Sequence, residues 1–156
     1  MGPEERGMDG SSEAQFEEAR RVFERSPFIA DLGLRLERLA PGACETSLQL
    51  LPRHLQQDGF VHAGVQATMA DHSAGGAGAT LLPEGRIVLS IEFKINLLRP
   101  ARGERLICRA KVLKAGRQVT VAESEVYAVD GGREVLVSKA TVTLAIVPIR
   151  AGTTDS

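Results

Sequence analysis

The sequence predicts a single α+β domain in which one curved antiparallel sheet covers a central helix. Three observations support this fold class. A chain of 156 residues is long enough for one domain with a substantial core but too short for two comfortable ones. An apolar segment rich in small residues, 62–78, has the length of a buried helix. Two strand-like segments precede it and four follow it, and strands joined by short turns are expected to pair antiparallel with their sequence neighbours.

The two ends of the chain are interpreted as tails. Residues 1–11 combine glycine, proline and charge with almost nothing to bury, which is typical of a disordered segment. The folded domain is therefore expected over 12–148, with a second tail over 149–156. The N-terminus is polar and acidic, and no segment approaches the roughly 20 apolar residues of a membrane span, so we expect no membrane association and a cytoplasmic protein.

A short amphipathic helix and a β-hairpin come before the central helix. Apolar residues recur at helical spacing up to Phe23, and Pro27 ends the run. Over 32–50 apolar and polar residues alternate around a Pro41-Gly42 turn, which is the pattern of a hairpin.

Four strands are predicted after the central helix, which makes a sheet of about six strands in all. They span 86–98, 104–113, 118–129 and 134–147, and turns containing glycine or proline divide them. A sheet of this kind leaves edge strands that can pair with a second copy of the chain, so we expect a homo-oligomer.

Composition argues against several classes of function. Nineteen basic and twenty acidic side chains give a net charge of -1, and five Phe with one Tyr form no aromatic, basic stripe, so nucleic-acid binding is not expected. Cys44 and Cys108 have no CxxC spacing, and the histidines lack a companion cluster, so neither a disulfide framework nor a metal site is expected. His54 is interpreted as a surface residue and His72 as a packed or interface residue.

Asp71 is the unusual residue of the central helix, HAGVQATMADHSAGGAG. Three glycines within four positions each cost a helix about 1 kcal/mol relative to alanine, so a close approach of the sheet, a partner subunit or a ligand is expected to offset them. Both sides of the helix are expected to be packed, and a carboxylate there is costly unless it is hydrogen-bonded, paired or used for chemistry. Two interpretations stay open: a general base, or a side chain that meets solvent or caps a nearby loop. The small neighbours of Asp71 on its helical face are Ala67, Thr68, Ala74, Gly75 and Gly78.

The start of the same helix offers a second chemical group. His62, Ala63 and Gly64 lie where the helix begins, and free N–H groups there can polarise a carbonyl oxygen. About eight residues, or roughly 12 Å of helix, separate this start from Asp71, which is too far for one helix to hold a small reacting group from both ends. Two antiparallel helices related by a two-fold axis would bring the start of one to Asp71 of the other.

These residues, together with others spread along the chain, resemble the hotdog-fold acyl-CoA thioesterases, specifically the PaaI-like branch named after phenylacetic acid degradation. The resemblance implies a hotdog fold and hydrolysis of an acyl or aryl-acyl coenzyme A thioester without metal or cofactor, because coenzyme A is part of the substrate. A dimer of dimers is the family expectation. The matching segments are SPFIADLGL (26–34), VHAG (61–64), MAD (69–71) and SIEFKINLLRPARG (90–103), and the resemblance covers about 26–148.

The resemblance also implies catalytic roles. Asp71 is the general base or nucleophile, and the amide of Ala63, which stands where relatives have glycine, polarises the thioester carbonyl. His62 positions the helix start, and Gln56 orients the substrate or the attacking water. Asp71 comes from one subunit and the other three residues come from its neighbour.

Four further residues are expected to contact substrate. The amide of Gly64 adjoins that of Ala63, and Ser90 matches a hydroxyl that some relatives place near the acid. Arg99 and Arg102, together with Arg105, form a local basic group that could hold the phosphates of coenzyme A. Two alternatives remain open, a hotdog hydratase or dehydratase with a histidine–carboxylate pair, and a non-catalytic acyl-CoA-binding module.

Overall fold

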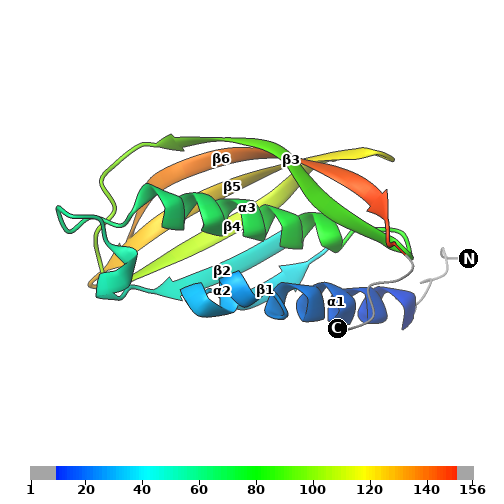
Figure 1. Cartoon of the computed structure of the whole chain (residues 1–156), viewed down its shortest axis with the longest axis horizontal. Coiled ribbons are helices and arrows are strands. Elements are labelled where there is room, and N and C mark those ends of the chain that lie inside the picture. Colours follow the sequence, from blue (N-terminus) through cyan, green and yellow to red (C-terminus); the bar gives the residue numbers. More distant parts are fainter. Residues whose placement is uncertain (1–9, 151–156) are drawn as a thin grey trace, which may run out of the picture.

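A computed structural model describes residues 10–150, and its elements follow the predicted order of helix, hairpin, central helix and four strands (Figure 1). The tail predicted over 1–11 lies outside the described residues as far as residue 9, and α1 already begins at Gly10. Most of the tail predicted over 149–156 also lies outside them. The elements are α1 (Gly10–Glu24), α2 (Pro27–Leu32), β1 (Arg35–Ala40), β2 (Ala43–Gln49), η1 (Pro52–His54), α3 (Ala63–Ala79), β3 (Arg86–Leu97), β4 (Arg105–Ala115), β5 (Val119–Asp130) and β6 (Arg133–Pro148).

The six strands form one antiparallel sheet in the order β1-β2-β4-β5-β6-β3, and this sheet curves around α3 (Figure 1). Neighbours in sequence pair as predicted in three cases, β1 with β2, β4 with β5 and β5 with β6. The prediction was wrong for β3 and β4, because β2 pairs with β4 and β3 pairs with β6. Each strand has two edges, and alternation of apolar residues does not indicate which distant strand fills the second one.

Two buried hydrogen bonds fix the position of α3 on the sheet. The hydroxyls of Thr46 on β2 and Ser73 on α3 are 2.8 Å apart, and Ser124 on β5 donates to the backbone oxygen of Ala70 at 2.7 Å. Both bonds lie within three residues of Asp71 along the helix. They therefore anchor the segment that carries the unusual carboxylate.

Glycines allow α3 to approach the sheet closely. A Cβ at Gly76 would lie 2.9 Å from Cys44 Sγ, and one at Gly78 would lie 2.8 Å from Leu144 Cδ1. A Cβ at Gly75 would meet no atom within 4 Å. The sheet thus accounts for two of the three glycines, and the side of α3 that carries Gly75 is open in the single chain.

The segment before the hairpin differs from the prediction. Pro27 does not simply end a helix: α1 stops at Glu24, and Pro27 opens the short α2, where proline at the first turn suits helix geometry. Gly33 ends α2 with φ of 90°, a left-handed conformation that favours glycine. α1 packs on α3 through the rings of Phe23 and His72, whose centroids are 4.3 Å apart. Within residues 10–150 no helix is long and apolar enough to cross a membrane.

Candidate functional site

Asp71 lies on the open side of α3 and is held there by one hydroxyl. Ser90 Oγ, on the edge strand β3, donates a hydrogen bond of 2.6 Å to Asp71 Oδ1. The pairing of β3 with β6 shifts between Ser90 and Glu92, so Ile91 is an extra residue at this point of the strand. The carboxylate is partly exposed, and its bond runs to a strand residue rather than to the backbone of a loop.

At the start of α3, one backbone N–H group has no hydrogen-bond acceptor within residues 10–150. The side chain of His62 caps the helix, since its Nδ1 accepts the N–H of Gly64 at 2.8 Å. The backbone oxygen of His62 accepts the N–H groups of Val65 and Gln66. Ala63 is an exposed residue, and within residues 10–150 its backbone N–H has no hydrogen-bond acceptor. Ala63 is therefore the available donor at this helix start, whereas the N–H of Gly64 is engaged.

Alanine fits at position 63 without backbone strain. No non-glycine residue between 10 and 150 has a positive φ, so Ala63 keeps an ordinary helical conformation. His62 has φ of −58° and ψ of 138°, an extended conformation typical of a helix cap. Because Nδ1 of His62 accepts the hydrogen bond from the Gly64 N–H, the neutral ring carries its own proton on Nε2.

Gln56 closes the loop that leads into α3. Its side-chain Oε1 accepts from the backbone N–H groups of Asp58 and Phe60. The backbone N–H of Gln56 donates to the backbone oxygen of Phe60 at 2.7 Å. Gly59, with φ of 79°, completes the turn. The sequence signalled the turn but not this use of the glutamine side chain. The Nε2 group has only a long contact, 3.5 Å, with Asp58 Oδ2 and so retains donor capacity.

Arg99 and Arg102, the substrate-binding candidates of the predicted basic group, have different surroundings. The guanidinium of Arg102 lies over the ring of Phe60, 4.0 Å from its centroid, and so next to the loop before α3. Arg99 donates from a guanidinium nitrogen to the backbone oxygen of Leu136 at 2.9 Å. Both arginines are exposed. Stacking leaves the N–H groups of Arg102 free to meet an anion in the plane of the guanidinium.

His54 is not a surface residue, and that prediction was wrong. Its side chain is 1% exposed, and both ring nitrogens have partners. Nδ1 accepts the N–H of Leu51 at 3.0 Å, and Nε2 lies 2.8 Å from the backbone oxygen of Leu32 at the end of α2. The backbone oxygen of His54 accepts the N–H of His62 at 2.9 Å. An isolated histidine in a polar-looking loop gives no sequence signal for such a junction.

The reactive groups elsewhere in the described residues do not join this site. Burial raises the pKa of Cys44 to about 12 and that of Cys108 to about 11, so both thiols stay protonated at neutral pH. Between residues 10 and 150 no three His, Cys, Asp or Glu side chains are grouped to bind a metal ion.

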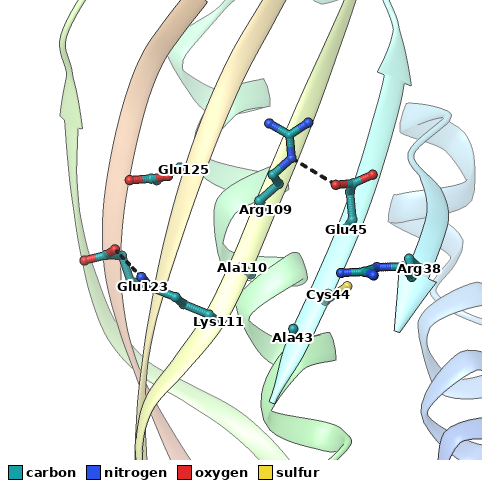
Figure 2. A pocket seen from close by; sticks show the side chains of 9 residues that line it. All are labelled: Arg38, Ala43, Cys44, Glu45, Arg109, Ala110, Lys111, Glu123 and Glu125. Carbon is teal, nitrogen blue, oxygen red and sulfur yellow. Dashed lines mark hydrogen bonds and ion pairs between the residues drawn. The ribbon is translucent and has the colours of Figure 1, made fainter. Parts of the chain in front are cut away.

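A concave surface that is separate from these residues lies on the side of the sheet away from α3 (Figure 2). Charged residues that line it pair with one another: Arg109 meets Glu45 at 2.9 Å, and Lys111 meets Glu123 at 3.8 Å. Arg109 also meets Glu134, which is not a lining residue, at 2.8 Å. Hydrogen bonds from Arg109 lower the pKa of Glu134. None of the predicted site residues lines this surface.

The chain does not bring its two chemical groups together. Ala63 and Asp71 lie on one helix, about eight residues or roughly 12 Å apart. Both belong to the part of α3 that the sheet leaves uncovered, because Ala63 is exposed and Asp71 is partly exposed. Ser90 is hydrogen-bonded to Asp71, whereas Gln56 and Arg102 lie at the loop before the start of α3.

Solved structures of thioesterases have the fold described above, as the following two comparisons show. A thioesterase family protein from Silicibacter pomeroyi is 40% identical with a TM-score of 0.84, over 86% of this chain and 98% of that one. A mutant of the phenylacetic acid degradation protein PaaI from Thermus thermophilus is 27% identical with a TM-score of 0.67, over 77% of this chain and 98% of that one.

Curated relatives and a family match agree with the structures. The proofreading thioesterase EntH of Klebsiella pneumoniae is 30% identical over 105 residues, which are 67% of this chain and 77% of that protein. The medium/long-chain acyl-CoA thioesterase YigI of Escherichia coli is 27% identical in an alignment of length 135 that covers 77% of this chain and 85% of that protein. Residues 58–135 match the Thioesterase superfamily, and they include α3 and β3 to β5. The chain belongs to the Thioesterase superfamily and has the hotdog fold of these enzymes.

Proposed function

We propose that the protein hydrolyses an acyl or aryl-acyl coenzyme A thioester to the free acid and coenzyme A. The observation that carries this proposal is the uncovered side of α3, where a free amide at Ala63 and a hydrogen-bonded carboxylate at Asp71 share one helix. An amide donor and a carboxylate can together hydrolyse a thioester, because the donor stabilises the carbonyl oxygen and the carboxylate activates water. The name of the relative YigI, an acyl-CoA thioesterase, supports the substrate class.

The proposed site is shared between two copies of the chain. Strand β3 has β6 on one side and no second partner within residues 10–150, and several of its apolar side chains are exposed. Leu89 is 54%, Ile91 58% and Leu97 51% exposed, which is costly for an edge strand that stays unpaired. Antiparallel pairing of β3 with β3 of a second copy would extend the sheet and place the two α3 helices side by side.

Residue spacing on α3 suits such a pair. If the two-fold axis passes near Ala67, residue 63 of one helix faces residue 71 of the other, because 67 lies midway between them. The residues that would meet near the axis are small, and Gly75, which has open space around it, lies farther along the same side. Each dimer would then contain two equivalent sites. A dimer of dimers remains the expected assembly beyond this pair.

The proposed reaction proceeds in two stages. The N–H of Ala63 polarises the thioester carbonyl while Asp71 removes a proton from water, and the water oxygen bonds to the carbonyl carbon. The tetrahedral intermediate then releases the thiolate of coenzyme A, which takes up the proton. Ser90 holds Oδ1 of Asp71 and leaves Oδ2 for the water. In the nucleophilic variant an oxygen of Asp71 bonds to the carbonyl carbon, and the C–S bond breaks to release the thiolate of coenzyme A. Water then cleaves the resulting anhydride to the free acid and the Asp71 carboxylate, and the proton released in this step neutralises the thiolate.

The loop before α3 would hold the rest of the substrate. The Nε2 donor of Gln56 would orient the acyl group or the water, and the guanidinium of Arg102, stacked on Phe60, would meet a phosphate of coenzyme A. Arg99 would contribute charge at longer range, since part of its guanidinium is bound to Leu136. The expected compartment is the cytoplasm.

Thiol release from a panel of acyl-CoAs tests the proposal. Wild type is expected to turn over at least one of them, and Asp71→Asn to lose on the order of 100-fold in kcat, the scale for a positioned base. Asp31→Asn, an exposed carboxylate on α2, is the matched control and should keep wild-type activity. Equal turnover by wild type and Asp71→Asn would refute the role of Asp71, and binding of acyl-CoA without turnover would favour a binding module.

The hydratase alternative makes a different demand on His62. A histidine that acts as a general base needs a free lone pair, but Nδ1 of His62 already accepts the Gly64 N–H, so the neutral ring offers only the Nε2–H and hence only an acid. This hydrogen bond therefore argues against His62 as the base of a hydratase. Hydration of an enoyl-CoA without release of thiol would contradict this interpretation.

A further inference from the structure

His54 links three separate segments at one buried point. Its backbone oxygen holds the N–H of His62, which is the residue before the proposed amide donor. Its ring holds the N–H of Leu51 and the last backbone oxygen of α2, at Leu32. The side chain is 1% exposed, so water does not compete for either ring nitrogen.

The ring orientation follows from these partners. An N–H group can only donate and a backbone oxygen can only accept, so Nδ1 is the acceptor and Nε2 carries the proton. The neutral ring in this tautomer satisfies Leu51 and Leu32 at once.

Both backbone groups of His54 are hydrogen-bonded, as are both nitrogens of its ring. It ends the η1 turn, in which its N–H donates to the Leu51 oxygen at 2.9 Å, and the chain then pairs Leu55 with Val61. Through this pairing the His54 oxygen reaches the His62 N–H at 2.9 Å. A rotation of the His62 backbone would redirect the N–H of Ala63, because that N–H belongs to the peptide group joining the two residues.

We propose that His54 is a positioning residue that orients the start of α3, and with it the N–H of Ala63. The inference rests on the proposed function, in which that N–H polarises the thioester carbonyl. His54 does not touch the substrate in this role. It acts through its backbone oxygen, and its ring keeps that oxygen in place.

Isosteric variants separate the two ring contacts. Asn at position 54 places an acceptor near the position of Nδ1 and can keep the Leu51 bond, whereas Gln places a donor near Nε2 and can keep the Leu32 bond. Phe keeps the ring shape and neither bond. Thr80→Val is the matched control, because the buried Thr80 accepts a hydrogen bond of 2.8 Å at Oγ1 from the Gly42 N–H at the opposite end of α3.

The experiment measures kcat and KM together with backbone amide exchange in the ligand-free protein. His54→Phe is expected to lower kcat on the order of 10- to 100-fold with KM within about twofold, because a misplaced donor weakens the transition state more than binding. Amide exchange should rise at residues 61–65 and stay at the wild-type level over 73–79. His54→Asn and His54→Gln should each recover part of the kcat, and Thr80→Val should leave kcat unchanged.

Opposite results would overturn the inference. A His54→Phe enzyme with wild-type kcat would do so, as would an increase in exchange spread evenly along α3, which indicates general loss of stability. If His54→Phe does not fold, the Asn and Gln variants provide the same comparison. Should wild type release no thiol from any acyl-CoA, the proposed function fails, and the exchange data alone decide whether His54 holds the helix start.

Discussion

Ser90 on the edge strand β3 donates a 2.6 Å hydrogen bond to Asp71 on α3, so the carboxylate is oriented by the strand that has an open edge. Ser90→Ala is expected to lower kcat by about tenfold, since a hydrogen bond to a charged group contributes about 1.5–3 kcal/mol. Steady-state thiol release measures it. Ser47→Ala, on the outer side of β2, is the control, and a kcat for Ser90→Ala equal to that of the control would show that Asp71 does not need this bond.

Ala63→Pro should remove the proposed donor and little else. Proline lacks the N–H and suits the first position of a helix, and the extended conformation of His62 is the one that a residue before proline adopts. A loss of kcat on the order of 100-fold is expected, as for the removal of an oxyanion donor. Ala63→Ser keeps the N–H and should stay near wild type. Similar kcat values for the two variants would leave the Ala63 amide without a role.

His72 is expected to make stability depend on pH. Burial lowers its pKa below the ordinary value of 6.5, although the Phe23 backbone and Asp71 oppose this shift. The neutral ring is therefore favoured in the folded state, and its contribution is complete above pH 6.5 and lost as the pH falls towards the lowered pKa. The free energy of unfolding should fall by at most about 1.4 kcal/mol per pH unit in this window. Urea unfolding at several pH values should show a shallower decline for His72→Phe, and identical slopes would contradict the assignment.

Strand β3 should carry the dimer contact. Ile91→Asp puts a charge on an apolar side chain that is 58% exposed in the single chain and would lie at the proposed interface. Sedimentation should detect a shift towards monomer, with thiol release falling in parallel. Leu113→Asp, on β4 and 52% exposed, is the control and should stay oligomeric. Unchanged assembly of Ile91→Asp would mean that copies associate through another surface.

Alternation and helical spacing predicted the central helix and all six strands. The strand predicted over 134–147 is Arg133–Pro148 in the structure, and the helix predicted over 62–78 is Ala63–Ala79. Local pattern could not predict that β2 pairs with β4, because pairing between distant strands depends on the whole sheet. It also missed α2, since Pro27 both ends one helical run and begins the next helix.

The candidate site was predictable only in part. Asp71 is conspicuous in the sequence because a carboxylate among small residues conflicts with a simple core helix. The resemblance to relatives indicated that Ser90 lies near Asp71, and the two side chains are hydrogen-bonded in the structure. The burial of His54 was missed because its partners are backbone groups, which any sequence can supply. For the same reason, nothing in the sequence indicated that the side chain of His62 occupies the Gly64 amide.

Mixed dimers of Asp71→Asn and Ala63→Pro chains test most directly whether two copies share the site. In a mixed dimer, one site would combine the intact helix start of the first chain with the intact Asp71 of the second, while the other site would carry both defects. Two inactive proteins that exchange subunits freely should then recover about a quarter of wild-type activity, because half of the dimers are mixed and half of their sites are intact. No recovery, with mixed dimers demonstrated by differently tagged chains, would contradict a shared site.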